Sequence, residues 1–132
     1  MIELDPAVLA LLEDRNWAVL ATTNADGTVQ QTLMWYALVD GSIVMNTAAG
    51  RRKHRNMVAR PAVSVCVTDQ DRFVTIQGQA TVLPDDRALH RRIGLRYISP
   101  DAMDHAFATQ FDLEERLTIR VSIDHVIAGL DG

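Results

Sequence analysis

The densest group of reactive side chains in this sequence of 132 residues is a run of cations between positions 51 and 60. It holds five of the thirteen Arg and Lys residues, although the formal net charge of the chain is −4. These five are Arg51, Arg52, Lys53, Arg55 and Arg60. The first three follow Ala48–Gly50 directly, at the start of a predicted helix that Pro61 stops. A helix start already carries partial positive charge, so cations there indicate a bound anion such as a phosphate.

Two neighbouring residues favour an anion site at this helix start. Thr47, at the end of a predicted strand, offers a hydroxyl donor from the other side of the loop. Lys53 lies four residues before Met57, on the same helix face, so we expect Lys53 to point inward. The segment alone leaves two alternatives open, a solvated basic helix and a patch for nucleic-acid backbones. The acidic composition and the lack of aromatic residues among the cations disfavour nucleic acid.

Histidine and cysteine form no group with the spacing of metal ligands. None of the four histidines shares a helix face with another at ligand spacing, and the single cysteine stands alone. The histidines are His54, His90, His105 and His125. We therefore expect no metal site and no disulfide, and we interpret Cys66, which lies in an apolar run, as a buried free thiol.

The sequence does not single out a catalytic residue. Asp112, Glu114 and Glu115 are interpreted as surface carboxylates before the last predicted strand. The basic group between residues 87 and 96 is interpreted as a solvated helix face. Tyr36 and Tyr97 are possible proton donors, but a structural position is the commoner role for such residues. Tryptophans 17 and 35 are expected in the core or in an interface.

The elements that must position the cation run are mostly strands. Alternating and β-branched segments predict strands at 17–23, 29–39, 42–47, 62–68, 72–83 and 116–127. Capping residues and apolar periodicity predict helices at 5–15, 51–60, 85–97 and 99–111. Asp26-Gly27 and Asp40-Gly41 predict hairpins that join the first three strands into a meander. We therefore expect one domain spanning residues 1–132, a mainly antiparallel β-barrel decorated with helices.

Size and hydropathy exclude other classes of protein. The longest apolar run, Leu33 to Val39, has seven residues, far fewer than the roughly 20 that a membrane-spanning helix needs. The first residues, Met1 to Pro6, contain acids where a signal peptide has basic residues. We therefore expect a cytoplasmic protein without a membrane partner.

Three segments, in order, resemble motifs of the pyridoxamine 5′-phosphate oxidase-like flavin-binding split barrels. The hairpin from Ala25 to Tyr36 is similar to the first motif of this family. Asn46-Thr47 followed by Gly50 to Asn56 is similar to its phosphate motif. Arg72 to Ala80 is similar to a later strand of the family. Together these segments cover most of the chain from Trp17 to Leu83.

The resemblance implies a six-stranded antiparallel split β-barrel of the FMN-binding type that forms a homodimer, with two cofactor sites at the subunit interface. It also implies cofactor-binding roles for eight residues. They are Thr47, Arg51, Arg52 and Lys53 for the phosphate, Gln30, Thr32 and Met34 along the ring, and Phe73 closing the partner subunit's pocket.

One departure from the family narrows the expected activity. Pyridoxamine phosphate oxidases have a C-terminal Trp and Arg that hold the substrate, and residues 122–132 contain neither. The chain is more similar to the branch that binds the deazaflavin coenzyme F-420, in its short length and in the segments Thr32 to Tyr36 and Gly50 to Lys53. This coenzyme has an oligoglutamate tail, which suits Arg55 and Arg60. The resemblance thus implies an oxidoreductase that transfers hydride from reduced F-420 to an unsaturated organic substrate. An FMN-dependent oxidase or reductase and a non-catalytic flavin carrier are the alternatives.

Overall fold

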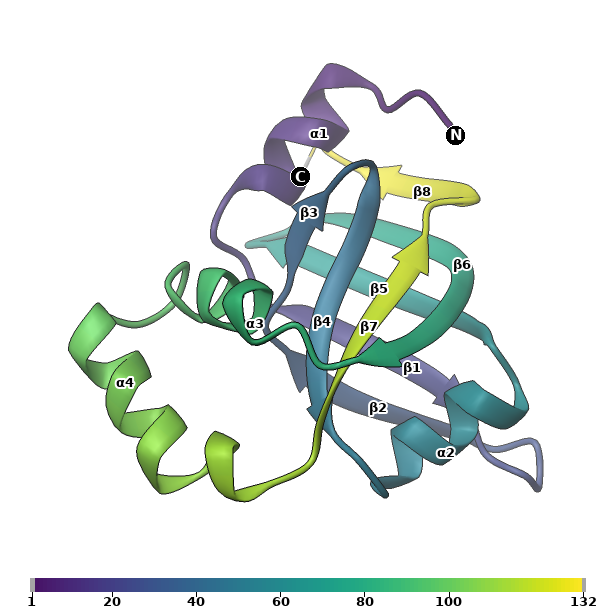
Figure 1. The fold of residues 1–132 in the computed structure, drawn as a ribbon. Coiled ribbons are helices and arrows are strands. Elements are labelled where there is room, and N and C mark those ends of the chain that lie inside the picture. The colour runs from purple at the N-terminus through teal and green to yellow at the C-terminus, as the bar shows by residue number, and fades with distance from the viewer. Residues whose placement is uncertain (1, 132) are drawn as a thin grey trace.

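A curled antiparallel sheet forms the body of the protein in a computed structural model that describes residues 2–131. Two helices lie at its opposite ends and two extend from its side (Figure 1). The strands are β1 (Ala18–Thr23), β2 (Val29–Met34), β3 (Ala37–Val39), β4 (Ser42–Ala48), β5 (Ala62–Asp69), β6 (Arg72–Pro84), β7 (Arg116–Ser122) and β8 (His125–Gly129). The helices are α1 (Pro6–Glu13), α2 (Arg52–Ala59), α3 (Arg87–Gly94), α4 (Pro100–Thr109) and the 3₁₀ turn η1 (Phe111–Leu113). The prediction of a mainly antiparallel β-barrel decorated with helices is confirmed.

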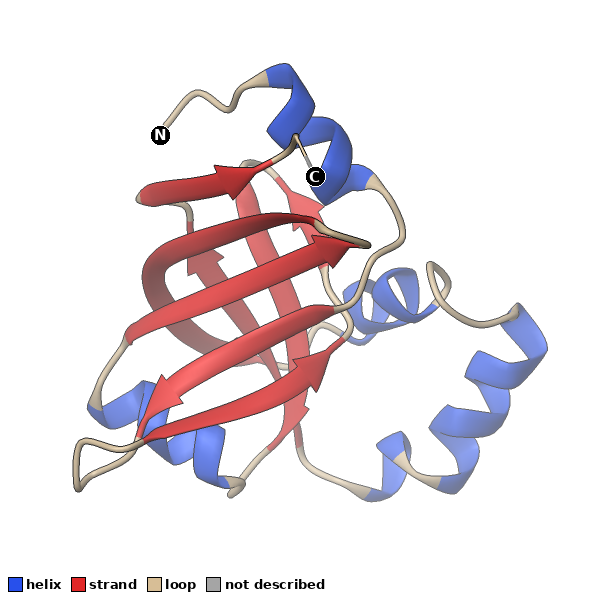
Figure 2. Ribbon diagram, turned by 180° about the vertical axis from the view of Figure 1, so that it is seen from behind, coloured by secondary structure: helices blue, strands red, loops and turns tan. Residues whose placement is uncertain are grey.

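The strand order is β2-β1-β5-β6-β7-β4-β3, and β8 pairs with β6 beside β7. The 13-residue strand β6 connects the two halves of the barrel. Its first part, residues 73–77, pairs with β8, and its last part, residues 80–84, pairs with β7. The sheet therefore curls around β6, and Figure 2 shows this curled layer from behind.

Two of the six predicted strands are each broken in two, so that residues 2–131 contain eight strands. The predicted strand 29–39 breaks at Trp35-Tyr36, where the Tyr36 N–H donates to the Tyr97 hydroxyl (3.2 Å) instead of to a strand. The predicted strand 116–127 breaks at Ile123-Asp124, where the Asp124 N–H donates to the Gln77 carbonyl (3.1 Å). Each break lets the chain pass from one strand partner to another.

Both predicted hairpins are confirmed. Gly27 has φ +87°, and Asp40 and Gly41, the two residues that connect β3 to β4, both have positive φ. Positive φ at both central residues is the geometry of the tight hairpin turns that Asn-Gly and Asp-Gly sequences favour.

Inward-facing aliphatic residues of the strands fill the barrel, and α1 covers one end. Leu20, Val65, Ile76 and Ile119 are essentially inaccessible to solvent. The Tyr36 hydroxyl, also in this core, donates to the carbonyl of Leu12 in α1 (2.7 Å). Tyr36 is therefore a structural residue.

Cys66 is only half-buried, so its prediction as a buried thiol is wrong. Strand β5 alternates, and Val63, Val65 and Val67 take the inward positions. Ser64 and Cys66 consequently point to the other face of the sheet. Among residues 2–131, no helix is both long enough and apolar enough to cross a membrane.

Candidate functional site

A cleft of about 330 Å³ opens where β2, the end of β4, the start of α2, and the segment from α3 to β7 meet. It is lined by Trp17, Thr32, Leu33, Met34, Trp35, Asn46, Thr47, Arg51, Lys53, His90, Ile93, Gln110, Phe111 and Arg116. The cations of this set lie around the start of α2, which we call the polar end, and Trp17 and Trp35 lie together at what we call the apolar end. Phe111 belongs to the polar end, because Arg116 lies over its ring. The lining suits a ligand with a polar and an apolar part.

The polar end is built around the start of α2. The Arg51 side chain makes no capping hydrogen bond, and the first N–H groups of α2 have no acceptor within residues 2–131. Thr47 is 2% exposed, and its buried Oγ1 has no hydrogen-bond partner. Lys53 is 6% exposed and points inward, as predicted. These unpaired donors meet in one corner, which we call the anion corner.

The electrostatics of this corner favour a bound anion. Burial lowers the pKa of Lys53 below its usual value, and the positive charges of Arg51 and Arg116 lower it further. Arg51, Lys53 and Arg116 thus repel one another, and within residues 2–131 fewer carboxylates than cations lie beside them. An anion beside them would stabilise the charged form of Lys53.

Arg116, from β7, is the cation that sequence reasoning missed. Its Nε donates to Oδ1 of Asn46 (2.9 Å), and Asn46 donates in turn to Asp85 (2.9 Å). The guanidinium also lies over the Phe111 ring, 4.7 Å from its centroid. No local motif marks Arg116, because it reaches the corner only through the pairing of β7 with β4.

Glu114 also belongs to this corner, so its interpretation as a simple surface carboxylate is wrong. Its Oε2 lies 3.5 Å from guanidinium nitrogens of both Arg51 and Arg116. Its Oε1 is buried and has no partner in the described chain. Glu114 therefore neutralises part of the positive charge of the corner.

The apolar end of the cleft contains stacked aromatic rings. Trp35 stacks on Tyr97 with ring centroids 5.3 Å apart, and Trp17 tilts against both. Trp17 is 48% exposed, so of its two expected places the core is excluded, and an interface stays a prediction. The Tyr97 hydroxyl donates to the Asn16 carbonyl (2.7 Å), and burial raises the pKa of Tyr97. Burial raises the pKa of Tyr36 to about 12. Neither tyrosine is poised to give up a proton.

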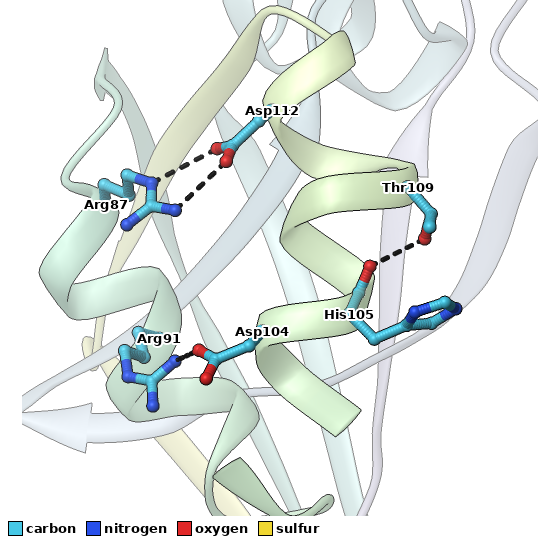
Figure 3. Close-up of polar contacts among 6 residues, drawn as sticks. All are labelled: Arg87, Arg91, Asp104, His105, Thr109 and Asp112. Atoms are coloured by element: carbon cyan, nitrogen blue, oxygen red, sulfur yellow. Dashed lines mark hydrogen bonds and ion pairs between the residues drawn. The ribbon is translucent and has the colours of Figure 1, made fainter. Parts of the chain in front are cut away.

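Helices α3 and α4 form an arm that carries one wall of the cleft. Figure 3 shows Arg87 of α3 donating two hydrogen bonds to Asp112, from Nε to Oδ1 (3.2 Å) and from Nη2 to Oδ2 (3.0 Å), and Arg91 paired with Asp104 of α4. The Thr109 hydroxyl closes the end of α4 on the His105 carbonyl (2.7 Å). These contacts hold η1 in place, and with it two residues of the cleft wall, Gln110 and Phe111.

The structure brings five of the eight sequence-predicted site residues to the cleft. They are Thr32, Met34, Thr47, Arg51 and Lys53. Arg52 lies instead in a separate hollow beside α2, together with Arg55 and Arg60. Gln30 and Phe73 lie outside the cleft lining, Phe73 at the start of β6 against Gly129.

Arg55 and Arg60, expected to suit an acidic tail, are already engaged within the chain. Arg55 donates to the Gly50 carbonyl (2.6 Å), and Arg60 donates to the Thr23 carbonyl (2.7 Å). Residues 2–131 contain no group of three or more His, Cys, Asp or Glu side chains arranged to hold a metal.

A curled antiparallel sheet decorated with helices is the fold of the flavin-binding split barrels. The chain belongs to the pyridoxamine 5′-phosphate oxidase family, whose model matches residues 4–128. This is a family of flavin-binding oxidoreductases. The resemblance inferred from the three sequence motifs is thereby confirmed.

Solved structures of similar fold include proteins with different ligands. An F-420 reductase is 28% identical, with a TM-score of 0.72 over 89% of this chain and 94% of that one. A conserved hypothetical protein from Mycobacterium tuberculosis is 24% identical (TM-score 0.78, 98% and 86% covered). An FAD-binding protein from Mesorhizobium loti is 21% identical (TM-score 0.66, 95% and 94% covered). None of the curated proteins matches this chain in sequence.

Proposed function

We propose that this protein is a homodimeric oxidoreductase that uses the reduced deazaflavin coenzyme F-420 to transfer hydride to an unsaturated organic substrate. The observation that carries the proposal is the anion corner, in which buried Thr47 and Lys53 and the free N–H groups of α2 present unpaired donors. The likeness to an F-420 reductase favours the deazaflavin coenzyme.

The residues of the cleft fit a coenzyme with a phosphate at one end and a planar ring at the other. Thr47, Arg51, Lys53 and the α2 start would hold the phosphate group. Thr32 and Met34 of β2 would lie along the ring, as the family resemblance implies. The coenzyme, when bound, supplies the hydride chemistry, and the protein binds, orients and shields it.

The side chains of the cleft are suited to binding rather than to acid–base catalysis. Tyr36 and Tyr97 use their hydroxyls as donors to main-chain carbonyls. Arg116 is held by Asn46 and stays charged, and Lys53 faces two other cations. We therefore assign no catalytic acid or base, and the proton that completes the reduction comes from solvent.

The homodimer is proposed because one side of the cleft is apolar and uncovered in the single chain. Strand β2 is an edge strand, and its Leu33, which lines the cleft together with Trp17, is 59% exposed. Val29, at the other end of β2, is 60% exposed. An exposed apolar strand edge is a surface that proteins normally cover. A second copy placed there would complete the wall of the cleft.

An FMN-dependent oxidase or reductase is the second candidate, because the same donors would hold the phosphate of FMN. The fold shared with an FAD-binding protein favours this alternative. A fluorescence titration with oxidised F-420, repeated with excess FMN, separates the two. Binding at micromolar concentration that FMN does not displace supports the proposal, whereas displacement by FMN supports the alternative. Tight binding without turnover on any acceptor would indicate a carrier.

The role of the anion corner is tested by Lys53→Ala, with Arg92→Ala as its matched control. Arg92 is an exposed cation of α3 outside the cleft lining. Loss of a charged hydrogen bond to phosphate should weaken coenzyme binding by about 1.5–3 kcal/mol. Arg92→Ala should leave the affinity unchanged. If the wild type, Lys53→Ala and Arg92→Ala bound the coenzyme with equal affinity, the phosphate would not bind in this corner.

A further inference from the structure

His90 is a buried histidine that the proposed function leaves without a role. It lies on α3, is 2% exposed, and lines the cleft one turn before Ile93. Phe107 packs on its ring edge to face, with centroids 5.2 Å apart, and Phe111 packs on it with centroids 4.5 Å apart. The imidazole is thus held in one orientation by two aromatic rings.

The two ring nitrogens of His90 have different surroundings. Nδ1 is fully buried and has no hydrogen-bond partner in the described chain. Nε2 also makes no hydrogen bond within residues 2–131, but it is not fully buried. It is therefore the nitrogen open to the cleft. A buried N–H without an acceptor is rarer in proteins than a buried acceptor without a donor. The proton of the neutral ring therefore belongs on Nε2, facing the cleft.

The ring is neutral under ordinary conditions. Burial lowers the pKa of His90 to about 4, and the positive charge of Arg116 contributes to this shift. A neutral N–H donor beside phenylalanine rings matches an uncharged acceptor. Arg116 and Arg87 lie over the faces of these rings, but Asp85 and Asp112 offset their charge at His90, so an anionic oxygen would gain little here for the solvation it loses. Lys53 and the α2 start are better binding partners for charged oxygens.

We propose that His90 binds the organic substrate, donating a hydrogen bond from Nε2 to an uncharged oxygen, such as the carbonyl of a conjugated ketone. The proposal rests on the proposed function in one respect, that a substrate enters this cleft beside the coenzyme. It selects, among unsaturated compounds, those with an oxygen acceptor near the double bond. Ile93 and Phe111 supply the apolar surroundings for the carbon skeleton.

The position of the proton is tested first and needs no coenzyme. Nitrogen NMR of protein labelled with ¹⁵N-histidine distinguishes the two neutral forms of the ring, and His90→Gln identifies the signals. The expected result near neutral pH is a proton on Nε2. A proton on Nδ1 would overturn the proposal even if the coenzyme binds as expected.

The same spectrum tests the ligand. With oxidised coenzyme present, so that no turnover occurs, cyclohex-2-en-1-one should shift the Nε2 signal, whereas cyclohexene, which lacks the oxygen, should not. If the proposed coenzyme does not bind, the two probes are added to the free protein. Equal responses to both probes, or none to the ketone, would exclude the hydrogen bond.

Turnover of the ketone separates hydrogen bonding from packing. His90→Phe removes the donor and keeps a ring, whereas His90→Gln keeps an N–H near the position of Nε2. We expect His90→Phe to lower kcat/KM about threefold to tenfold, the effect of one neutral hydrogen bond, with His90→Gln close to wild type. The coenzyme Kd and the Tm should change little in either variant. Equal losses in both variants, or a weakened coenzyme Kd, would assign His90 to packing or to the coenzyme instead.

Discussion

Asn46 and Arg116 lie on paired strands, and their side chains meet at 2.9 Å, where the Arg116 Nε–H donates to Asn46 Oδ1. This contact holds Arg116 in the anion corner. Among the described residues that line the cleft, Arg116 is the only cation that β7 contributes. Asn46 also donates to Asp85, and this second hydrogen bond fixes the Asn46 side chain that holds Arg116.

Replacing Asn46 by Ala should therefore weaken phosphate binding, because Arg116 loses the hydrogen bond that orients its guanidinium in the corner and keeps only its contacts with Glu114 and Phe111. We expect a loss of about threefold to tenfold, equivalent to one hydrogen bond, measured by titration calorimetry with the coenzyme. Asn24→Ala is the control, because Asn24 makes its side-chain bonds to Thr28 and Asn56 and does not line the cleft. A weaker affinity in the control as well would indicate a general change in the fold.

Glu114→Gln should have the opposite effect. The variant keeps the shape of the side chain but removes the negative charge shared by Arg51 and Arg116. Partly exposed pairs of this kind are worth about 0.2–1 kcal/mol, so anion binding should tighten by up to about fivefold. Glu115→Gln, an exposed neighbour, should not change it. Weaker binding in Glu114→Gln would mean that Glu114 positions the two arginines rather than competing for them.

Phosphate binding should also depend on pH through Lys53. The pKa of Lys53 is lowered by burial and by neighbouring cations, and a bound anion would raise it again. The free protein therefore loses this proton at a lower pH than the complex, and affinity should fall as pH rises through the lowered pKa of free Lys53. Lys53→Arg, which stays charged, should flatten the dependence. Parallel pH profiles for both proteins would exclude Lys53 as its source.

His90 should make the fold less stable in mild acid. Its pKa is about 4 in the folded protein, against about 6.5 in an unfolded chain. Between these values the unfolded state binds more protons, so the free energy of unfolding falls as pH drops from about 6.5 to 4 and changes little below that. Urea unfolding across this range should show the loss, and His90→Gln should reduce it. His105→Gln, at an exposed histidine of α4, should retain it.

Gly78→Ala should destabilise the barrel strongly. A Cβ at Gly78 would lie 1.7 Å from the Ser122 carbonyl oxygen, so the strands would have to separate. Overpacking of this kind costs about 1–3 kcal/mol or more. Gly27→Ala is the control, since Gly27 has positive φ but no atom near its Cβ position, and it should lose only about 1 kcal/mol. Comparable Tm values for the two variants would contradict this close approach.

Local signals in the sequence predicted the features that depend on neighbouring residues. Asp40-Gly41 forms a tight turn, Asp5 and Ser99 cap their helices, and Lys53 faces inward. These outcomes depend on contacts within a few residues, which a sequence displays directly.

Features that depend on distant contacts were not predictable in the same way. Strand 29–39 breaks because Tyr97, far along the chain, takes the Tyr36 N–H. Arg116 and His90 reach the cleft through a strand pairing and a helical arm that leave no motif. Cys66 was predicted to be buried because it lies in a run of apolar residues. In such a run the sequence does not show which residues of the strand face the core and which face the other side.

The pairing of β4 with β7 has a consequence for the growing chain. Thr47 and α2 are synthesised long before Arg116, and only the antiparallel register of Ala48 with Arg116 brings the three together. Pairing of such distant segments requires closure of a long loop, which costs chain entropy. The complete binding corner should therefore form only once β7 has been synthesised and has paired with β4. A nascent chain that ends before β7 would have a helix start rich in cations but little affinity for the coenzyme.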